Sequence, residues 1–140
     1  MTESAACRSV TGMNGRELQK CAALRARELP ATTLEFPFGP DVDVYKVRGT
    51  MFMFLTVVDD EPLVVLKAFP PDGLALREAH PDITPGYHMD KKHWISLHPG
   101  GGLGPDMIEE LVTESYRLVV AGLPREQRPV EPHAFGRGQR

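Results

Sequence analysis

Apolar and polar residues along the first thirty positions follow the spacing of a capped helix. Asn14 precedes Glu17 by three residues, the spacing of a capping box, and apolar residues then recur every three or four positions. We therefore predict a first helix over residues 15–29, which Pro30 ends because proline cannot continue a helix.

Short apolar runs separated by turn residues replace the helical pattern after this point. Because connections of a few residues can join only antiparallel neighbours, the runs predict a meander. Residues 37–40 (Pro-Phe-Gly-Pro) form a rigid corner between the first two runs. The predicted strands cover residues 33–36, 42–47, 51–58 and 63–69.

The second half of the chain combines helices with one more strand. We predict a short helix over about residues 72–79, a loop and a strand over about 92–98, and a glycine-rich connection over 99–104. Pro105 begins the last helix, and Gly122 ends its apolar repeat. The expected fold is α+β, in the order α-β-β-β-β-α-β-α, with an antiparallel sheet of about five strands.

Length and charge narrow the class of protein. A chain of 140 residues fits one domain, which we place at residues 14–124 between a disordered segment (1–13) and a flexible tail (125–140). The net charge of −3 provides no general attraction to nucleic acid or lipid. No apolar stretch is long enough to cross a membrane, and we expect no secretory signal, because no apolar segment follows a charged start. We expect Cys7 and Cys21 to be reduced thiols of a cytoplasmic protein.

Catalytic and metal-binding motifs are not found. His88, His93 and His98 are spaced by five residues, and strand alternation would place the last two on opposite faces of the sheet. The sequence contains neither C-x-x-C nor H-E-x-x-H, and no serine lies in a nucleophile elbow. We therefore expect no catalytic residue, metal or cofactor, and do not favour an enzyme.

Residues 83–97 (ITPGYHMDKKHWISL) concentrate aromatic and basic side chains around a Pro-Gly turn. One interpretation is a phosphate-binding surface, in which Lys91, Lys92 and His93 contact a nucleic-acid backbone. The other is structural, with Trp94 as a core anchor and Tyr87 and its neighbour His88 holding the turn by hydrogen bonds. The residues alone leave both interpretations open.

Four segments give the chain a resemblance to the MmcQ/YjbR-like family. They are FPFGPDVDVYKVRGTMFMFL (36–55), PLVVLKAFP (62–70), ITPGYHMDKKHWISL (83–97) and SYRLVVAGLP (115–124), and the resemblance covers about residues 14–124. It implies an antiparallel sheet with helices mainly on one face, similar to secretion chaperones and frataxin-like proteins. It also implies DNA binding, by analogy with a double-wing arrangement, and no particular reaction or cofactor. The shared signature positions are Lys46, Pro85, Gly86, Tyr87, His88, Lys92, His93 and Trp94.

Two positions depart from the family pattern. Thr50 stands where the family often has a lysine, which removes one cation from the strand turn, and glycines at 100–104 replace a more polar connection. Both departures reduce the positive charge or polarity that a phosphate-binding surface would use.

Our first hypothesis is a small, non-enzymatic, cytoplasmic bacterial protein that binds DNA weakly. The residues expected to form the nucleic-acid site are Lys46, Arg48, Tyr87, His88, Lys91, Lys92, His93 and Trp94. A second hypothesis is a protein-interaction module that uses an exposed sheet face or edge, including self-association as a homodimer. A third is a small-molecule pocket near His88 and His93.

Overall fold

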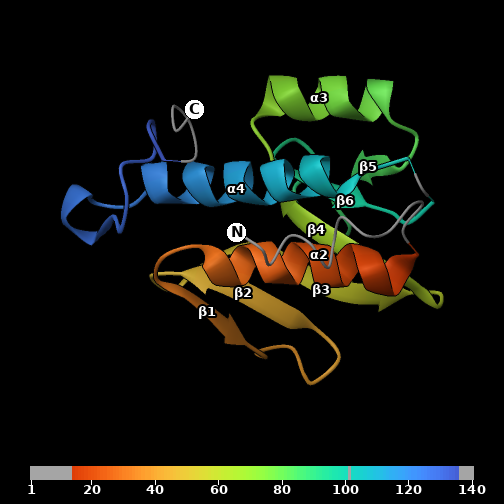
Figure 1. Cartoon of the computed structure of the whole chain (residues 1–140), viewed down its shortest axis with the longest axis horizontal. Helices are drawn as coiled ribbons and strands as arrows, with labels where there is room; N and C mark the ends of the chain where they lie inside the picture. Colours follow the sequence, from red (N-terminus) through yellow and green to blue (C-terminus); the bar gives the residue numbers. More distant parts are fainter. Residues whose placement is uncertain (1–13, 101, 136–140) are drawn as a thin grey trace.

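The computed structural model describes residues 14–100 and 102–135 and contains one six-stranded antiparallel sheet, in the spatial order β1-β2-β3-β4-β6-β5 (Figure 1). The predicted α+β class is confirmed. In the part of the chain that the structure describes, none of the helices combines the length and the apolar character needed to span a bilayer. The elements are α2 (Gly15–Glu28), β1 (Thr32–Glu35), β2 (Asp43–Val47), β3 (Thr50–Val58), β4 (Glu61–Lys67), α3 (Pro70–Ala79), β5 (Ile83–Pro85), β6 (Trp94–Leu97), α4 (Pro105–Ala121) and the 3-10 helix η1 (Arg125–Gln127).

Helix α2 begins with the predicted capping box. The Asn14 side-chain oxygen accepts the Glu17 N–H at 2.9 Å, and a Glu17 carboxylate oxygen accepts the Asn14 N–H at 2.9 Å. Two N–H groups that the first turn leaves without partners are thereby bonded. The helix ends at Glu28, one residue before the prediction, with Leu29 as its C-cap.

The sheet has one strand more than the sequence predicts. Strand β5 is only three residues long, and it pairs with β6 so that Ile83 lies opposite Leu97. A three-residue segment that ends in Pro85 is too short to show an alternating pattern, so the sequence analysis predicted a loop at these positions. A register shift between Tyr45 and Lys46 also marks a bulge in β2, where it pairs with β3.

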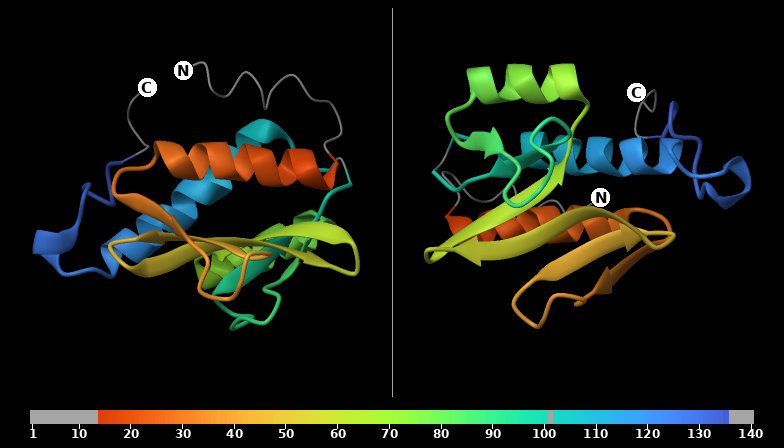
Figure 2. Two further views of the ribbon diagram at one scale, coloured as in Figure 1. Left: turned by 90° about the horizontal axis from the view of Figure 1, so that it is seen from below. Right: turned by 180° about the vertical axis from the view of Figure 1, so that it is seen from behind.

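The two faces of the sheet are covered differently (Figure 2, left). Helices α2 and α4 lie over one face, which we call the first face, and enclose the main core; here the rings of Phe52 and Tyr116 meet edge to face at 5.5 Å. The opposite, second face carries a small cluster of Val44, Phe54, Val65 and Trp94. The segment between β5 and β6, residues 86–93, projects from this second face, and we call it the 86–93 turn.

Part of the expected flexible tail is packed in the structure. Arg128 donates hydrogen bonds to the carbonyl oxygens of Ala121 and Leu123, and the Phe135 ring lies 5.7 Å from that of Tyr116. The last five residues and the first thirteen, where we expected disorder, lie outside the described residues.

Cys21 corrects one expectation about the cysteines. It lies on the buried side of α2, as its helical spacing predicts, but it is disulfide-bonded. The expectation of two reduced thiols is therefore wrong for Cys21, whereas Cys7 lies outside the described residues.

Candidate functional site

The first half of the 86–93 turn is fixed against β6 by backbone contacts. The Gly86 N–H donates to the Trp94 carbonyl at 2.9 Å, and the Tyr87 N–H donates to the Ser96 hydroxyl at 2.9 Å. A Cβ atom at Gly86 would lie 2.5 Å from the Trp94 Cβ, so only glycine fits this close approach. Pro85 and Gly86 therefore hold the turn against the last strand.

The second half of the turn is organised by Asp90. One carboxylate oxygen accepts the Lys92 N–H at 2.9 Å, and the other lies 2.6 Å from Nδ1 of His93. The hydrogen bond from His93 and then that from the Lys92 backbone lower the pKa of Asp90. The ionised Asp90 therefore sits among the cationic residues of the turn and reduces its local positive charge.

The structure divides the predicted site residues of this turn into two groups. Trp94, only 9% exposed, belongs to the buried cluster on the second face, and the half-buried Tyr87 packs against that cluster. Lys91 and Lys92 are exposed. The Lys91 ammonium also donates to the Gly86 carbonyl at 3.2 Å. The two lysines lie within one short turn, whereas the indole ring is part of the fold's interior.

Lys46 and Arg48 are not brought to this turn. Lys46 forms an ion pair with Glu35 across β1 and β2 at 3.0 Å, and its hydrogen bond lowers the pKa of Glu35. Arg48 donates to the Gln127 carbonyl at 3.0 Å, beyond the end of α4. Because β3 and β4 separate β2 from β6, three strand spacings, or about 14 Å, lie between the two groups. The predicted basic residues do not form one continuous surface.

The three candidate histidines contact different groups. His88 is exposed at a positive φ of 58°, with its ring 4.1 Å from that of Tyr87. His93 contacts Asp90, whereas His98 lies 2.8 Å from the Thr84 hydroxyl. Within residues 14–100 and 102–135, no three His, Cys, Asp or Glu side chains are grouped as metal ligands would be.

An exposed aromatic surface follows β1, and the sequence analysis described it only as a rigid corner. Phe36 and Phe38 are 51% and 70% exposed, and Leu34 in β1 is 37% exposed. We call these three residues the aromatic corner. Among residues 14–100 and 102–135, strand β1 pairs only with β2, so its other edge is open within this part of the chain. The signal was present in the sequence, because prolines at 37 and 40 keep these phenylalanines out of a regular, buried strand.

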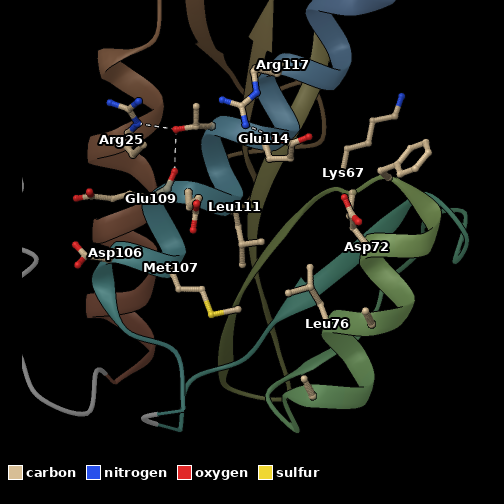
Figure 3. Close-up of a pocket in the computed structure, with 16 residues that line it drawn as sticks. Arg25, Lys67, Asp72, Leu76, Asp106, Met107, Glu109, Leu111, Glu114 and Arg117 are labelled. Carbon is tan, nitrogen blue, oxygen red and sulfur yellow. Dashed lines mark hydrogen bonds and ion pairs between the residues drawn. The ribbon is translucent and has the colours of Figure 1, made fainter. Parts of the chain in front are cut away.

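A groove of about 1350 Å³ lies between α3 and α4 (Figure 3). Leu76 of α3 and Met107 and Leu111 of α4 form its apolar part, and Asp72, Glu114 and other charged residues line its rim. We call it the α3–α4 groove. Neither His88 nor His93 lines it, so it is distinct from the pocket that the third hypothesis expected.

Comparison with known proteins places this arrangement in a class of small α+β domains. The structure matches a Deinococcus radiodurans protein with a DUF419 domain at a TM-score of 0.70, with 32% identity, covering 84% of this chain and 86% of that one. A Pseudomonas syringae protein matches at a TM-score of 0.61, with 25% identity, covering 71% of this chain and 96% of that one.

Sequence comparison defines the family. The YjbR family model matches residues 27–118. The uncharacterized protein YbdF of Escherichia coli O157:H7 is 40% identical over 121 residues, covering 86% of this chain and 99% of YbdF. The uncharacterized protein YjbR of Escherichia coli K12 is 36% identical over 83 residues, covering 59% of this chain and 70% of YjbR. The chain belongs to the YjbR family, as its four sequence segments predicted.

Proposed function

We propose that this protein is an interaction module that associates with a second copy of itself through the open edge of β1 and the aromatic corner. The observation that carries this proposal is the exposure of Phe36 and Phe38 beside an unpaired strand edge. Burial of a phenylalanine side chain contributes roughly 1.5–3 kcal/mol, so leaving two in water favours a partner.

The exposed apolar residues are concentrated rather than scattered. Of the six large apolar side chains that are exposed among the described residues, three belong to the aromatic corner and lie within five positions. Leu34 lies in β1, and the hydrogen bond from the Gly39 N–H to the Phe36 carbonyl at 3.2 Å closes the turn that carries Phe38. A cluster of this kind is more typical of a binding surface than of a solvated loop.

A second copy can provide hydrogen-bond partners for the edge of β1 as well as an apolar surface for the aromatic corner. Alternate residues of β1 direct their N–H and C=O groups away from β2, and an antiparallel copy related by a two-fold axis can pair with them. Pro30 and Pro37 confine this pairing to a four-residue strand, so the aromatic contacts supply most of the affinity.

Light scattering coupled to size exclusion, over a range of protein concentrations, tests the proposal. We expect a concentration-dependent dimer, and we expect Phe36→Ser/Phe38→Ser to raise its dissociation constant by at least about 100-fold. Val57→Ser/Leu74→Ser is the matched control, because these side chains are 54% and 51% exposed and lie elsewhere. A monomer throughout the micromolar range, or equal effects of both double variants, contradicts the proposal.

DNA binding through the 86–93 turn is the second candidate function, favoured by the exposure of Lys91 and Lys92 on a turn whose backbone is held in place. His88 and His93 would add contacts beside the lysines, with Tyr87 and Trp94 as supports and Lys46 and Arg48 outside the contact. Two phosphate contacts give weak, salt-sensitive binding without sequence specificity.

Fluorescence anisotropy of labelled duplex DNA at low and moderate salt tests this second candidate. We expect Lys91→Ala/Lys92→Ala to reduce the log–log salt slope by about 1.8, since each lost phosphate contact contributes about 0.9. Arg16→Ala/Lys20→Ala removes the same charge from exposed positions of α2 and should retain the slope. If both double variants reduce DNA binding equally, the binding depends on the overall charge of the protein and not on the 86–93 turn.

The proposed setting of either function is the bacterial cytoplasm. The similar proteins come from Escherichia, Deinococcus and Pseudomonas, which supports a bacterial origin. Cys21 is disulfide-bonded in the structure, whereas a reducing cytoplasm would keep it as a thiol, so trapping its redox state in cells with a thiol-specific reagent tests the location.

A further inference from the structure

We propose that Thr84, His98 and Glu61 form a catalytic site that hydrolyses small, activated carboxylic esters. Nε2 of His98 lies 2.8 Å from the Thr84 hydroxyl oxygen, and Nδ1 of the same ring lies 3.5 Å from a Glu61 carboxylate oxygen. A hydroxyl, an imidazole and a carboxylate in this order are the groups that nucleophilic acyl transfer uses. None of the three residues belongs to the aromatic corner or to the 86–93 turn, so the site is separate from both proposed binding surfaces.

Three neighbouring strands place the side chains in one row on the second face of the sheet. Glu61 lies in β4, four residues before Val65 of the second-face cluster, and side chains return to the same face at every second position of a strand. His98 follows β6, four residues after Trp94 of the same cluster. Thr84 lies in β5, which pairs with β6. The spatial order β4-β6-β5 therefore sets the imidazole between the carboxylate and the hydroxyl.

The carboxylate beside His98 determines which ring nitrogen carries the proton. An ionised carboxylate only accepts hydrogen bonds, so Glu61 favours the tautomer of His98 that is protonated at Nδ1. Nε2 then carries a lone pair and can accept the proton of the Thr84 hydroxyl. The backbone is also held here, because the His98 N–H donates to the Asp82 carbonyl at 2.8 Å. A hydroxyl that is hydrogen-bonded to an oriented base is an activated nucleophile.

The hydroxyl of Thr84 is accessible, whereas the neighbouring serine hydroxyl is not. Thr84 is half-buried, and the His98 side chain is 25% exposed. Ser96, which lies opposite Thr84, is only 1% exposed and accepts the Tyr87 N–H. Within residues 14–100 and 102–135, β5 pairs only with β6 and so forms an open edge of the sheet. A small ester with a good leaving group suits this open site, because its reaction requires little binding energy from the protein.

The reaction consumes one water molecule and regenerates the threonine. The Thr84 oxygen attacks the ester carbonyl carbon while Nε2 of His98 takes the hydroxyl proton. The bond from this carbon to the leaving oxygen then breaks, and His98 gives its proton to the leaving alcohol. Water attacks the acyl-Thr84 ester and gives a proton to His98, and this proton returns to the threonine oxygen as the carboxylic acid leaves. Glu61 does not touch the substrate and acts as a positioning residue for the imidazole.

Hydrolysis of p-nitrophenyl acetate by the full chain tests the proposal. We expect faster turnover than with an equal concentration of free imidazole, and peptide mass spectrometry should find an acetyl group on Thr84. His98→Asn should lower kcat by about 10²-fold or more, since general-base catalysis typically contributes about 10²–10⁴-fold. Glu61→Gln should lower kcat by at least about tenfold with KM unchanged, because the neutral amide no longer favours the required tautomer.

The matched control is Thr50→Ala/His133→Asn, which removes the same two residue types at exposed positions outside the site. It should leave the rate and the acetyl adduct unchanged, whereas Thr84→Ala should abolish the adduct. Thr84→Ser keeps a hydroxyl and should retain an adduct at position 84, and circular dichroism of each variant separates lost chemistry from lost folding.

Three outcomes would overturn the proposal. The first is turnover by the native chain that is no faster than with free imidazole. The second is an acetyl group that appears only on lysine or histidine side chains. The third is a loss of rate in the control variant as large as that in His98→Asn, which would assign the hydrolysis to exposed imidazoles in general.

Discussion

The two faces of the sheet differ in how deeply they are covered, and this difference separates the buried candidate residues from the exposed ones. In the part of the chain that the structure describes, 22 buried residues form the core between the first face and its helices, whereas the cluster on the second face has four. The 86–93 turn covers part of this second cluster through Tyr87 and Met89, and Val42 and Met51 pack against the rest. The residues that the sequence pattern groups as one site therefore fall into two kinds. Tyr87 and Trp94 belong to the small apolar cluster, whereas Lys91 and Lys92 lie in water.

The largest expected effect is on the free energy of unfolding, and it should differ between two phenylalanines of β3. Phe52→Ala should reduce the free energy of unfolding by about 3–5 kcal/mol, because the side chain is fully buried against Tyr116. Phe54→Ala should cost at least about 1 kcal/mol less, since its cluster is small and near solvent. Urea unfolding of both variants measures the difference. Equal costs would show that the second face is as tightly packed as the first.

The sequence predicted the elements of the first face well because their signals are local. The capping box at Asn14 and the apolar repeat of α4 each depend on residues within a few positions of one another. The candidate site was predicted less well, since the partners of its residues are distant in sequence: Lys46 meets Glu35, and Arg48 meets Gln127. No local pattern reveals which charges are already paired. The groove depends similarly on the angle between α3 and α4, which short-range patterns do not encode.

A smaller effect is expected where the turn meets the second face. Gly86→Ala should cost about 2 kcal/mol, because the added methyl overlaps Trp94 and displaces the turn. Trp94 is the only tryptophan in the chain, so its fluorescence reports this face directly and should shift to the red as the indole meets water. Gly104→Ala, where an added Cβ meets no atom within 4 Å, should cost less than about 1 kcal/mol, the usual penalty for alanine at a helix N-cap. An unchanged emission maximum in Gly86→Ala would mean that the turn does not cover Trp94.

Two buried serines test the hydrogen bonds of each face. Ser115 accepts the Lys67 N–H and donates to the Phe52 carbonyl on the first face, whereas Ser96 accepts the Tyr87 N–H on the second. Ser115→Ala leaves two backbone groups without this partner and should cost about 2 kcal/mol. Ser96→Ala should cost about 1 kcal/mol, since the half-buried Tyr87 can be hydrated. Urea unfolding gives both values, and amide exchange at Lys67 and Tyr87 locates each loss. A larger cost for Ser96→Ala than for Ser115→Ala would contradict the expectation that the serine hydrogen bonds contribute more stability on the first face.

The smallest effect concerns Asp90, whose carboxylate holds the outer half of the turn. Its pKa is lowered in the folded state by His93 and the Lys92 N–H, so the ionised form favours folding. This stabilisation is present above the ordinary carboxyl pKa of 3.8 and is lost as the pH falls below that value. NMR titration of the Asp90 carboxyl should place its midpoint below 3.8 in the native protein, and His93→Ala should move it upward. Asp41→Ala, which removes an exposed carboxylate far from the turn in sequence, should leave the titration unchanged. A normal Asp90 midpoint in the native protein would mean that His93 and Lys92 leave this carboxylate in solution, and that the turn owes its shape to Gly86 and the packing of Tyr87 alone.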